Sequence, residues 1–405
     1  MRLLQINTVV NTGSTGRIME GIGKVAISSC HESFVVYYKS GPAGSSSKML
    51  KTGNKIDLYV HGIRSRLIDR HGFGSARVTK KLIDKIRKID PDIIGLHNLH
   101  GYYLNVEILF NYLKDAQKPV VWTFHDCWPF TGHCVYFDRV GCEKWKTECH
   151  SCPQKKQYPA SYGLDQSNRN YHQKRELFNG LKNLTIVTPS AWLKSLVKQS
   201  FLKEYPVEVI HNGIDLQAFS PVHVRLPEGI RDIQDKKIIL GVASIWDERK
   251  GLAEFKKLSP LLSDEYRIVL VGLNEKQIRD LPDSITGVAR TESVEQLAAL
   301  YSSAHVYVNP TLSDNFPTTN IEALACGTPV ITYKTGGSPE SISEETGIVV
   351  PQRDVAGLAD SIAQISKKGK SHYNQACRDR AVSLYSEEER FSDYVELYEK
   401  MLAST

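Results

Sequence analysis

Short apolar runs alternate with longer amphipathic stretches along most of the chain. Each run is about four to eight residues long, the length of a strand buried on both faces of a parallel sheet. The stretches between the runs repeat apolar residues at helical spacing. The runs fall at 3–10, 34–39, 92–97, 119–124, 184–189, 207–210, 237–242, 267–272, 306–310 and 329–332. This alternation predicts an α/β protein built of two doubly wound, Rossmann-like domains facing a central cleft.

The boundary between the two domains is expected near residue 213. A chain of 405 residues is long enough for two domains. The run at 207–210 ends in His211-Asn-Gly-Ile-Asp215, and Asn-Gly is a strong turn signal. We therefore assign residues 1–213 to the N-terminal domain and 214–386 to the C-terminal domain, and predict a final helix over 387–405.

Composition places the protein among soluble globular proteins. Apolar residues make up 41% of the chain and charged residues 24%. No apolar run is long enough to cross a membrane. The N-terminal stretch lacks the small-residue cleavage site of a signal peptide, which predicts a cytoplasmic protein.

Positive charge is concentrated between residues 60 and 90. The net charge is +6, and this segment holds nine basic residues against three acidic ones, interleaved with apolar residues. Such a pattern is typical of an amphipathic surface that contacts anionic lipid headgroups. A solvated helix face is the alternative. We expect no nucleic-acid partner, because no recognised reader motif accompanies the charge. The basic residues are Arg64, Arg66, Arg70, Arg77, Lys80, Lys81, Lys85, Arg87 and Lys88.

The segment 309–330, NPTLSDNFPTTNIEALACGTPV, predicts a binding loop that enters a helix. Asp314 lies in the loop, where the following Asn-Phe-Pro disfavours helix. Thr318, Thr319 and Asn320 are candidate N-caps of a helix expected from about Thr319 to Ala325. A helix N-terminus attracts diphosphates, and Glu322 is expected in the first turn. Two acids around such a site suit a diphosphate flanked by hydroxyl-rich groups, as in a sugar nucleotide.

Polar residues follow three strands of the N-terminal half, at the sheet edge where ligands bind in open α/β folds. Gly13 and Gly16 lie in a glycine-rich turn, expected over residues 11–16, that precedes a helix over 17–28. His97, His100 and Tyr102 leave the run at 92–97 and are candidate acceptor contacts, with simple loop packing as the alternative. His125-Asp126 follows the run at 119–124. The Gly/Ser-rich segment 41–51 is expected to be a mobile loop.

Five of the eight cysteines lie within residues 127–152. The last four, Cys134, Cys142, Cys149 and Cys152, have the spacing C-x7-C-x6-C-x2-C, and the C-x2-C half is typical of four-thiolate zinc sites. A structural zinc would stabilise a segment too polar to fold by burial. Free buried thiols are the alternative, and His133 or His150 could replace one thiolate.

Several motifs resemble those of family-four retaining glycosyltransferases, which have the GT-B fold. The segment 314–322 resembles the family's Glu-x7-Glu signature, with Asp314 in place of the first Glu, and EALACGTPVI after it is typical of the family. TPSAWL at 188–193, HNGID at 211–215 and TGGSPE at 335–340 also resemble family motifs. The Cys-rich insertion resembles that of bacterial surface-polysaccharide glycosyltransferases. In GT-B folds the last helix crosses back onto the first domain.

The resemblance implies a role for each matching residue. His125 occupies the place of the catalytic histidine, Asp314 contacts the donor sugar, and Glu322 binds the ribose. Lys250 matches the lysine that neutralises the donor diphosphate. Ser244 stands where the family has an arginine, and Arg249 could supply the missing charge. The substrate-binding residues are then Gly13, Gly16, His97, His100, Arg249, Gly272, Arg290, Asn315, Phe316, Pro317, Thr318, Thr319 and Glu322.

The implied activity is retaining transfer of a sugar from a nucleoside-diphosphate sugar to a glycan acceptor, without a catalytic metal. A polyprenol-linked acceptor of bacterial polysaccharide synthesis would place the protein at the inner face of the cytoplasmic membrane. The alternatives are a sugar phosphorylase on the same fold and a non-catalytic sugar-nucleotide-binding or scaffold protein. Ser244 and Asp314 are the departures that keep the last alternative open.

Overall fold

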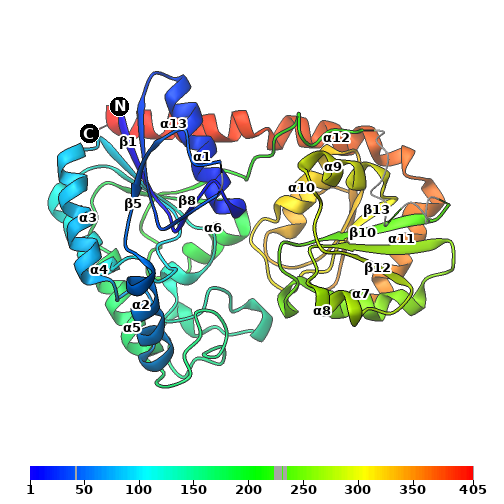
Figure 1. Ribbon diagram of the computed structural model, residues 1–405, viewed down its shortest axis with the longest axis horizontal. Helices are drawn as coiled ribbons and strands as arrows, with labels where there is room; N and C mark the ends of the chain where they lie inside the picture. Colours follow the sequence, from blue (N-terminus) through cyan, green and yellow to red (C-terminus); the bar gives the residue numbers. More distant parts are fainter. Residues whose placement is uncertain (42, 223–229, 231–234, 405) are drawn as a thin grey trace. The chain divides into compact units, whose positions relative to one another are not determined.

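A computed structural model of the chain describes residues 1–41, 43–222, 230 and 235–404. The chain forms two compact units, one of Met1–His211 with Glu388–Thr405 and the other of Asn212–Glu387. Each unit is a parallel sheet flanked by helices (Figure 1).

Unit 1 contains a seven-stranded sheet in the order β5-β3-β1-β6-β7-β8-β9, parallel throughout. Its strands are β1 Arg2–Ile6, β3 Glu32–Tyr37, β5 Lys48–Lys51, β6 Ile93–Leu96, β7 Val120–Thr123, β8 Leu184–Thr188 and β9 Val207–Val209. Its helices are α1 Gly13–Ser28, α2 Lys55–Ile68, α3 Ala76–Ile89, α4 Val106–Ala116, α5 Ser167–Phe178, α6 Ala191–Val197 and α13 Glu387–Ala403. The short strands β2 Val9–Val10 and β4 Lys39–Ser40 pair separately.

Unit 2 contains a six-stranded parallel sheet in the order β12-β11-β10-β13-β14-β15. Its strands are β10 Lys237–Val242, β11 Tyr266–Val271, β12 Ile285–Val288, β13 Val306–Asn309, β14 Val330–Tyr333 and β15 Gly347–Val350. Its helices are α7 Leu252–Leu258, α8 Glu275–Arg279, α9 Val294–Ser303, α10 Thr318–Ala325, α11 Val355–Lys368 and α12 Ser371–Tyr385.

Strand order fixes where each unit can bind a ligand. In unit 2 the chain runs outward from β10 to β11 and β12, then returns to the other side of β10 with β13. The loops after β10 and β13 therefore leave the sheet in opposite directions, and a crevice opens at such a switch point. Unit 1 has the same arrangement at β1 and β6.

The C-terminal helix α13 packs on the sheet of unit 1. Its Phe391, Tyr394 and Tyr398 are buried in one cluster with Ile18 of α1 and Val121 of β7. Figure 1 shows α13, in red, beside α1. The predicted helix over 387–405 is thus α13, and Thr405 lies outside the described residues.

Four local predictions were wrong. The run at 3–10 is broken after Ile6, because the Asn7 side chain donates to the carbonyl of Val9 and accepts from Thr8 N–H. Helix α1 begins at Gly13, so the glycines expected in a turn lie in its first turn. The segment 41–51 was expected to be a loop throughout, but its last four residues, Lys48–Lys51, form edge strand β5. Pro42 lies outside the described residues.

The fourth error concerns the start of α10. Its N-cap is Pro317, without a side-chain cap, so the three polar residues proposed as caps are the first helical residues. Glu322 is consequently in the second turn. The sequence Phe-Pro-Thr-Thr-Asn offered several hydroxyl and amide caps, but proline before a helix favours the extended conformation that an N-cap position needs.

Candidate functional site

Two loops of unit 2 meet at its switch point. The loop after β10 makes a 3-10 turn over Glu248–Lys250, in which Asp247 Oδ1 accepts a 3.0 Å hydrogen bond from the Lys250 N–H. The loop after β13 attaches to this turn, because Leu312 N–H donates to the Arg249 carbonyl at 2.7 Å. Thr311 Oγ1 donates to the same carbonyl. These bonds hold the basic turn against the acidic loop.

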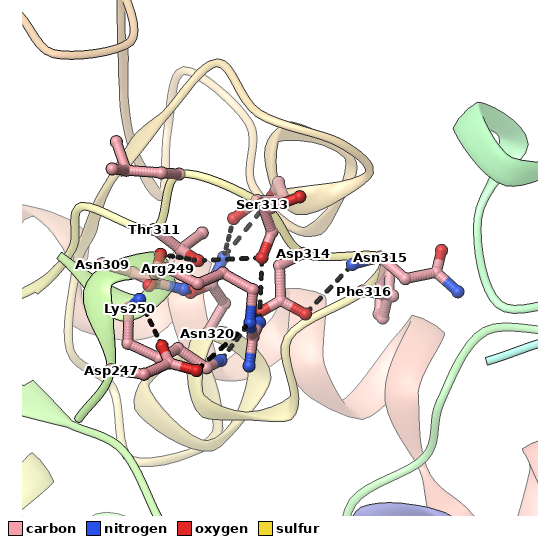
Figure 2. Close-up of polar contacts among 12 residues, drawn as sticks. Asp247, Arg249, Lys250, Asn309, Thr311, Ser313, Asp314, Asn315, Phe316 and Asn320 are labelled. Atoms are coloured by element: carbon pink, nitrogen blue, oxygen red, sulfur yellow. Dashed lines mark hydrogen bonds and ion pairs between the residues drawn. The ribbon is translucent and has the colours of Figure 1, made fainter. Parts of the chain in front are cut away.

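Asp314 lies between two cations, as Figure 2 shows. Lys250 Nζ is 2.6 Å from Asp314 Oδ2, and Arg249 Nη1 is 3.5 Å from the same oxygen. Arg249 Nη1 also donates to the Ser313 carbonyl at 2.9 Å. Burial raises the pKa of Asp314, but the two cations outweigh burial and the pKa lies below its ordinary value. The carboxylate is therefore ionised at neutral pH.

The family resemblance led us to expect a guanidinium at position 244, and in the structure Arg249 brings one to the Asp314 loop. Ser244 follows β10 and is exposed. Arg249 stands five residues later and directs its guanidinium to the Asp314 loop. The site thus pairs a planar, bidentate cation with the compact ammonium of Lys250, a combination suited to phosphate oxygens.

The backbone around Asp314 is tightly packed. Asn315 N–H donates to Asp314 Oδ1 at 3.0 Å, which fixes the carboxylate. Gly336, after β14, has φ +55°, and a Cβ there would lie 1.7 Å from the Asp314 carbonyl oxygen. Only glycine therefore lets this loop approach Asp314. Gly272, after β11, is limited in the same way by the Ala243 carbonyl oxygen.

Helix α10 is fastened by buried polar bonds. Glu322 is buried, and its Oε2 accepts a 2.8 Å hydrogen bond from the hydroxyl of Tyr301 on α9. Asn320 accepts from Asn309 Nδ2 at 2.8 Å and donates to Ser338 Oγ at 3.0 Å. The Asn320 amide is therefore structural. These bonds join α10 to β13 and to the turn after β14, so the acid on the helix keeps a fixed position.

The other predicted contacts of unit 2 lie around these two loops. Phe316 is buried, and its carbonyl accepts from Asn212 Nδ2 at 2.9 Å. Thr318 and Thr319 are partly buried in the first turn of α10. Arg290 is exposed in the loop between β12 and α9. Within the predicted set of unit 2, hydrogen bonds and ion pairs thus join Arg249, Lys250 and Asn315 to Asp314.

In unit 1, His125 stacks on His97. Their ring planes differ by 16°, and His125 Nε2 is 3.1 Å from His97 Nδ1. His97 Nε2 is in turn 3.2 Å from Gln5 Oε1, and Gln5 Nε2 donates to the Met19 carbonyl. Sequence reasoning missed Gln5, although a polar residue inside the apolar strand LLQI was a signal.

This chain of bonds sets the tautomer of His125. Burial lowers the pKa of His97 well below its ordinary value and that of His125 to about 4, so both rings are neutral. Gln5 Oε1 accepts from His97 Nε2–H, which leaves the His97 lone pair on Nδ1. His97 Nδ1 then accepts from His125 Nε2–H. The basic nitrogen of His125 is Nδ1.

The acid next to His125 serves another histidine. Asp126 Oδ2 is 2.8 Å from His100 Nε2, and Asp126 Oδ1 accepts from the Trp128 N–H. His100 Nδ1 contacts the Tyr158 hydroxyl at 3.0 Å. His100 is buried, so these contacts make it part of the support beneath the loop. Gly13 and Gly16 lie in the first turn of α1, where a Cβ on Gly16 would crowd Asn11 N.

The four cysteines of the insertion come together. Cys134, Cys142, Cys149 and Cys152 line one pocket of about 20 Å³ with His133 and His150. A hydrogen bond from Cys134 lowers the pKa of Cys152 to about 7. However, in the described part of the chain no three His, Cys, Asp or Glu side chains are placed to hold a metal ion. The zinc prediction is not confirmed.

Residues 26–218 match the sequence model of Glycosyltransferase Family 4, and residues 236–368 match that of Glycosyl transferases group 1. These two segments cover most of the chain. The chain is a glycosyltransferase made of a Glycosyltransferase Family 4 domain followed by a Glycosyl transferases group 1 domain. The fold is GT-B, as predicted.

Two relatives of this glycosyltransferase have names that refer to glycan synthesis. A protein of Escherichia coli (strain K12) named as the colanic acid biosynthesis glycosyl transferase WcaC is 26% identical over 99% of this chain and 100% of its own length. The N,N'-diacetylbacillosaminyl-diphospho-undecaprenol alpha-1,3-N-acetylgalactosaminyltransferase of Campylobacter jejuni is 27% identical over 50% of this chain and 56% of its own.

A solved structure shares the fold over the whole length. HepE of Anabaena in complex with UDP-glucose has a TM-score of 0.66, 14% sequence identity and full coverage of both chains. The chain is therefore a glycosyltransferase with the GT-B fold.

Proposed function

We propose that this glycosyltransferase takes a sugar from a nucleoside-diphosphate donor and transfers it with retention of anomeric configuration. The observation that carries the proposal is the convergence of Arg249, Lys250 and Asp314 at the switch point of the unit 2 sheet. Two adjacent cations beside a helix start suit a diphosphate. The similarity to HepE, which was solved with UDP-glucose, supports such a donor.

Each residue then has a role in the reaction. Lys250 and Arg249 bind the diphosphate and stabilise the negative charge that grows on it as the glycosidic bond breaks. Asp314 holds the donor sugar, and Glu322, fixed by Tyr301, binds the ribose hydroxyls. The neutral His125 supports the positive charge that develops at the anomeric carbon. A phosphate oxygen accepts the proton of the acceptor hydroxyl, so no protein base is required in this step.

The acceptor is a glycan, and we favour a polyprenol-linked one. The Campylobacter relative is named for a diphospho-undecaprenol acceptor, and the Escherichia coli relative for colanic acid biosynthesis. A cytoplasmic enzyme at the inner face of the membrane would meet such an acceptor. Transfer to a short-chain polyprenyl-diphosphate glycan but not to the free glycan is the expected outcome. Equal rates would remove the lipid requirement.

Nucleotide binding is the first test. A thermal-shift series with UDP, GDP and ADP should yield one stabilising nucleotide, with about 2.7 kcal/mol of stabilisation at 100 times its Kd. Glu322→Gln should weaken the binding of that nucleotide. Glu275→Gln, which removes one exposed charge on α8, should leave the binding unchanged. If none of the three stabilises the protein, the donor assignment is wrong.

A non-catalytic binding protein is the second candidate, favoured by two observations. Asp314 already pairs with both cations, and position 244 offers no guanidinium. This alternative predicts nucleotide binding without donor turnover. A sugar phosphorylase would instead turn over with free phosphate. Measuring donor hydrolysis with and without phosphate separates the three.

Structural zinc at the insertion stays a prediction. Thiol chemistry and the common pocket favour it, but the side chains are not arranged as ligands. Metal analysis of the purified protein should find one zinc per chain. The Cys149→Ser variant and the Cys152→Ser variant should each lack this zinc. Protein without zinc that unfolds at the same temperature would exclude it.

A further inference from the structure

Helix α2 presents its apolar side to solvent. The opposite side packs on the rest of unit 1, and its buried residues are small or polar: His61, Gly62 and Ser65. Helices of globular proteins usually have the reverse arrangement. Five large apolar side chains at spacings of three and four residues form one outward stripe, each between 52% and 73% exposed: Ile56, Tyr59, Val60, Ile63 and Leu67.

A second segment extends the stripe. Tyr162 N–H donates to the Arg66 carbonyl at 2.8 Å, and Leu164 N–H donates to the Leu67 carbonyl at 2.9 Å. Both side chains are exposed, Tyr162 by 66% and Leu164 by 56%. The loop is therefore bound to the C-terminal end of α2 while its apolar side chains face solvent. We call the stripe and these two residues the α2 surface.

Basic residues flank the α2 surface. Arg64 and Arg66 are exposed and lie on opposite sides of the stripe, as their positions on a helix of 3.6 residues per turn require. A groove of about 390 Å³ runs from the start of α2 to α3 and is lined by Lys51, Thr52, Gly53, Asn54, Asp57, Arg77, Val78, Lys81, Leu82 and Lys85. Its single acid, Asp57, is engaged in capping α2.

The structure also corrects which residues of the basic segment are available. Leu82, Ile83 and Ile86 of α3 are buried in the core of unit 1. They do not contribute to an exposed apolar surface, although the apolar residues interleaved between 60 and 90 suggested one. The exposed large apolar side chains come from α2 and its bound loop, and α3 contributes the exposed basic side chains of Arg77, Lys81 and Lys85.

We propose that the α2 surface docks on a bilayer that contains anionic phospholipids, with α2 in the plane of the interface and the groove facing phosphate headgroups. An apolar stripe flanked by arginines is the pattern of helices that lie in a membrane interface. No helix among the described residues is long and apolar enough to span a membrane. A second copy is disfavoured, because joining two α2 surfaces would bring two basic grooves together.

Vesicle co-sedimentation tests the proposal with the full chain. Wild-type protein should sediment with vesicles of phosphatidylcholine mixed with phosphatidylglycerol, less with phosphatidylcholine alone, and less at high salt. Ile63→Gln combined with Leu67→Gln should lower the partition coefficient roughly tenfold or more. Lys81→Glu should lower it at least about fivefold, the value of one basic residue near an anionic surface.

Matched variants control for these changes. Leu261→Gln removes an equally exposed leucine in unit 2, and Lys24→Glu reverses an exposed charge on α1. Both should bind vesicles like wild type. Unchanged binding of the α2 variants would overturn the proposal, as would a wild-type dimer that these variants convert to monomer without any vesicle binding. If the glutamine pair fails to fold, Lys81→Glu decides.

The docking proposal is independent of the donor site. Nucleotide-induced thermal shifts should be the same in the α2 variants and in wild type. Loss of vesicle binding with normal nucleotide shifts isolates the α2 surface, whereas absent nucleotide shifts in all proteins would refute the proposed donor site and leave docking standing.

Discussion

Asp314→Asn should tighten nucleotide binding while it slows sugar transfer. In the structure this carboxylate forms ion pairs with both cations: Asp314 Oδ2 is 2.6 Å from Lys250 Nζ and 3.5 Å from Arg249 Nη1. A diphosphate must share or displace that interaction, and it also meets the negative charge of Asp314. The isosteric amide removes the competitor without changing side-chain volume. Nucleotide affinity and catalysis are therefore expected to change in opposite directions.

The magnitude follows from the distances. A phosphate oxygen bonded to Lys250 Nζ would lie about 5 Å from Asp314 Oδ2, where unit charges at an effective dielectric constant of about 20 repel by roughly 3 kcal/mol. Screening by solvent and salt at this partly exposed site should reduce the effect to about 1 kcal/mol. The Kd of the nucleoside diphosphate should therefore fall roughly fivefold.

Asp314→Asn should tighten nucleotide binding but lower the stability of the ligand-free protein. Without Asp314, Lys250 is left partly buried beside Arg249, which costs about 2 kcal/mol. For a unit of this size the ligand-free Tm should fall by roughly 4–8 °C.

Isothermal titration with the stabilising nucleotide gives the Kd, and thermal unfolding gives the Tm. Glu275→Gln, which removes one exposed charge of the same unit, should change neither. Weaker nucleotide binding by Asp314→Asn would refute the reasoning, because it would mean that the carboxylate contributes to nucleotide binding rather than opposing it.

Three further perturbations test other parts of the site. Tyr301→Phe removes a buried hydrogen bond to Glu322, so it should lower the free energy of unfolding by about 1.5–3 kcal/mol and weaken nucleotide binding. Denaturant unfolding measures the first effect and titration the second. An unchanged affinity for the nucleotide would contradict the role of this bond. His97→Phe removes the acceptor of His125 Nε2–H and should lower kcat roughly tenfold at constant donor KM, whereas an equal change in both would indicate general damage. Burial lowers the pKa of His61 and of His125 to about 4, so the unfolded state binds more protons than the folded state as pH falls from 6.5 towards 4. Urea unfolding should therefore show a free energy of unfolding that is lower at pH 5 than at pH 7 by about 2 kcal/mol for each histidine. An equal free energy of unfolding at the two pH values would refute the conclusion that both histidines are buried in the neutral form.

Regular elements were largely readable from the sequence, because a strand buried on both faces must be apolar along its length. The runs at 237–242 and 267–272 became β10 and β11 within a residue or two. Helix α9 begins where Ser293 could cap it, and its side chain accepts from Gln296 N–H. Errors occurred where a side chain or a proline changed the local backbone, as at Asn7 and Pro317.

Site residues were partly readable, for a different reason. Lys250 and Asp314 could be grouped because both match family motifs, and the loops that hold them follow parallel strands that end at one edge of the sheet. Two supporting residues were missed: Gln5, which contacts His97, and Tyr301, which donates to Glu322. Each acts from an element distant in sequence, and neither an apolar strand nor a helix face showed which neighbour the residue would contact.

The sequence by itself determined the alternation of strands and helices and the two-part chain, because periodicity is a local property. Motif resemblance indicated the acids and bases that could bind a nucleotide sugar. Only the tertiary structure decided that Arg249 and Lys250 both pair with Asp314, that His97 sets the tautomer of His125, and that α2 rather than α3 exposes its apolar side. Pairing and exposure depend on which surfaces the fold brings together or leaves uncovered, and residue spacing alone does not determine them.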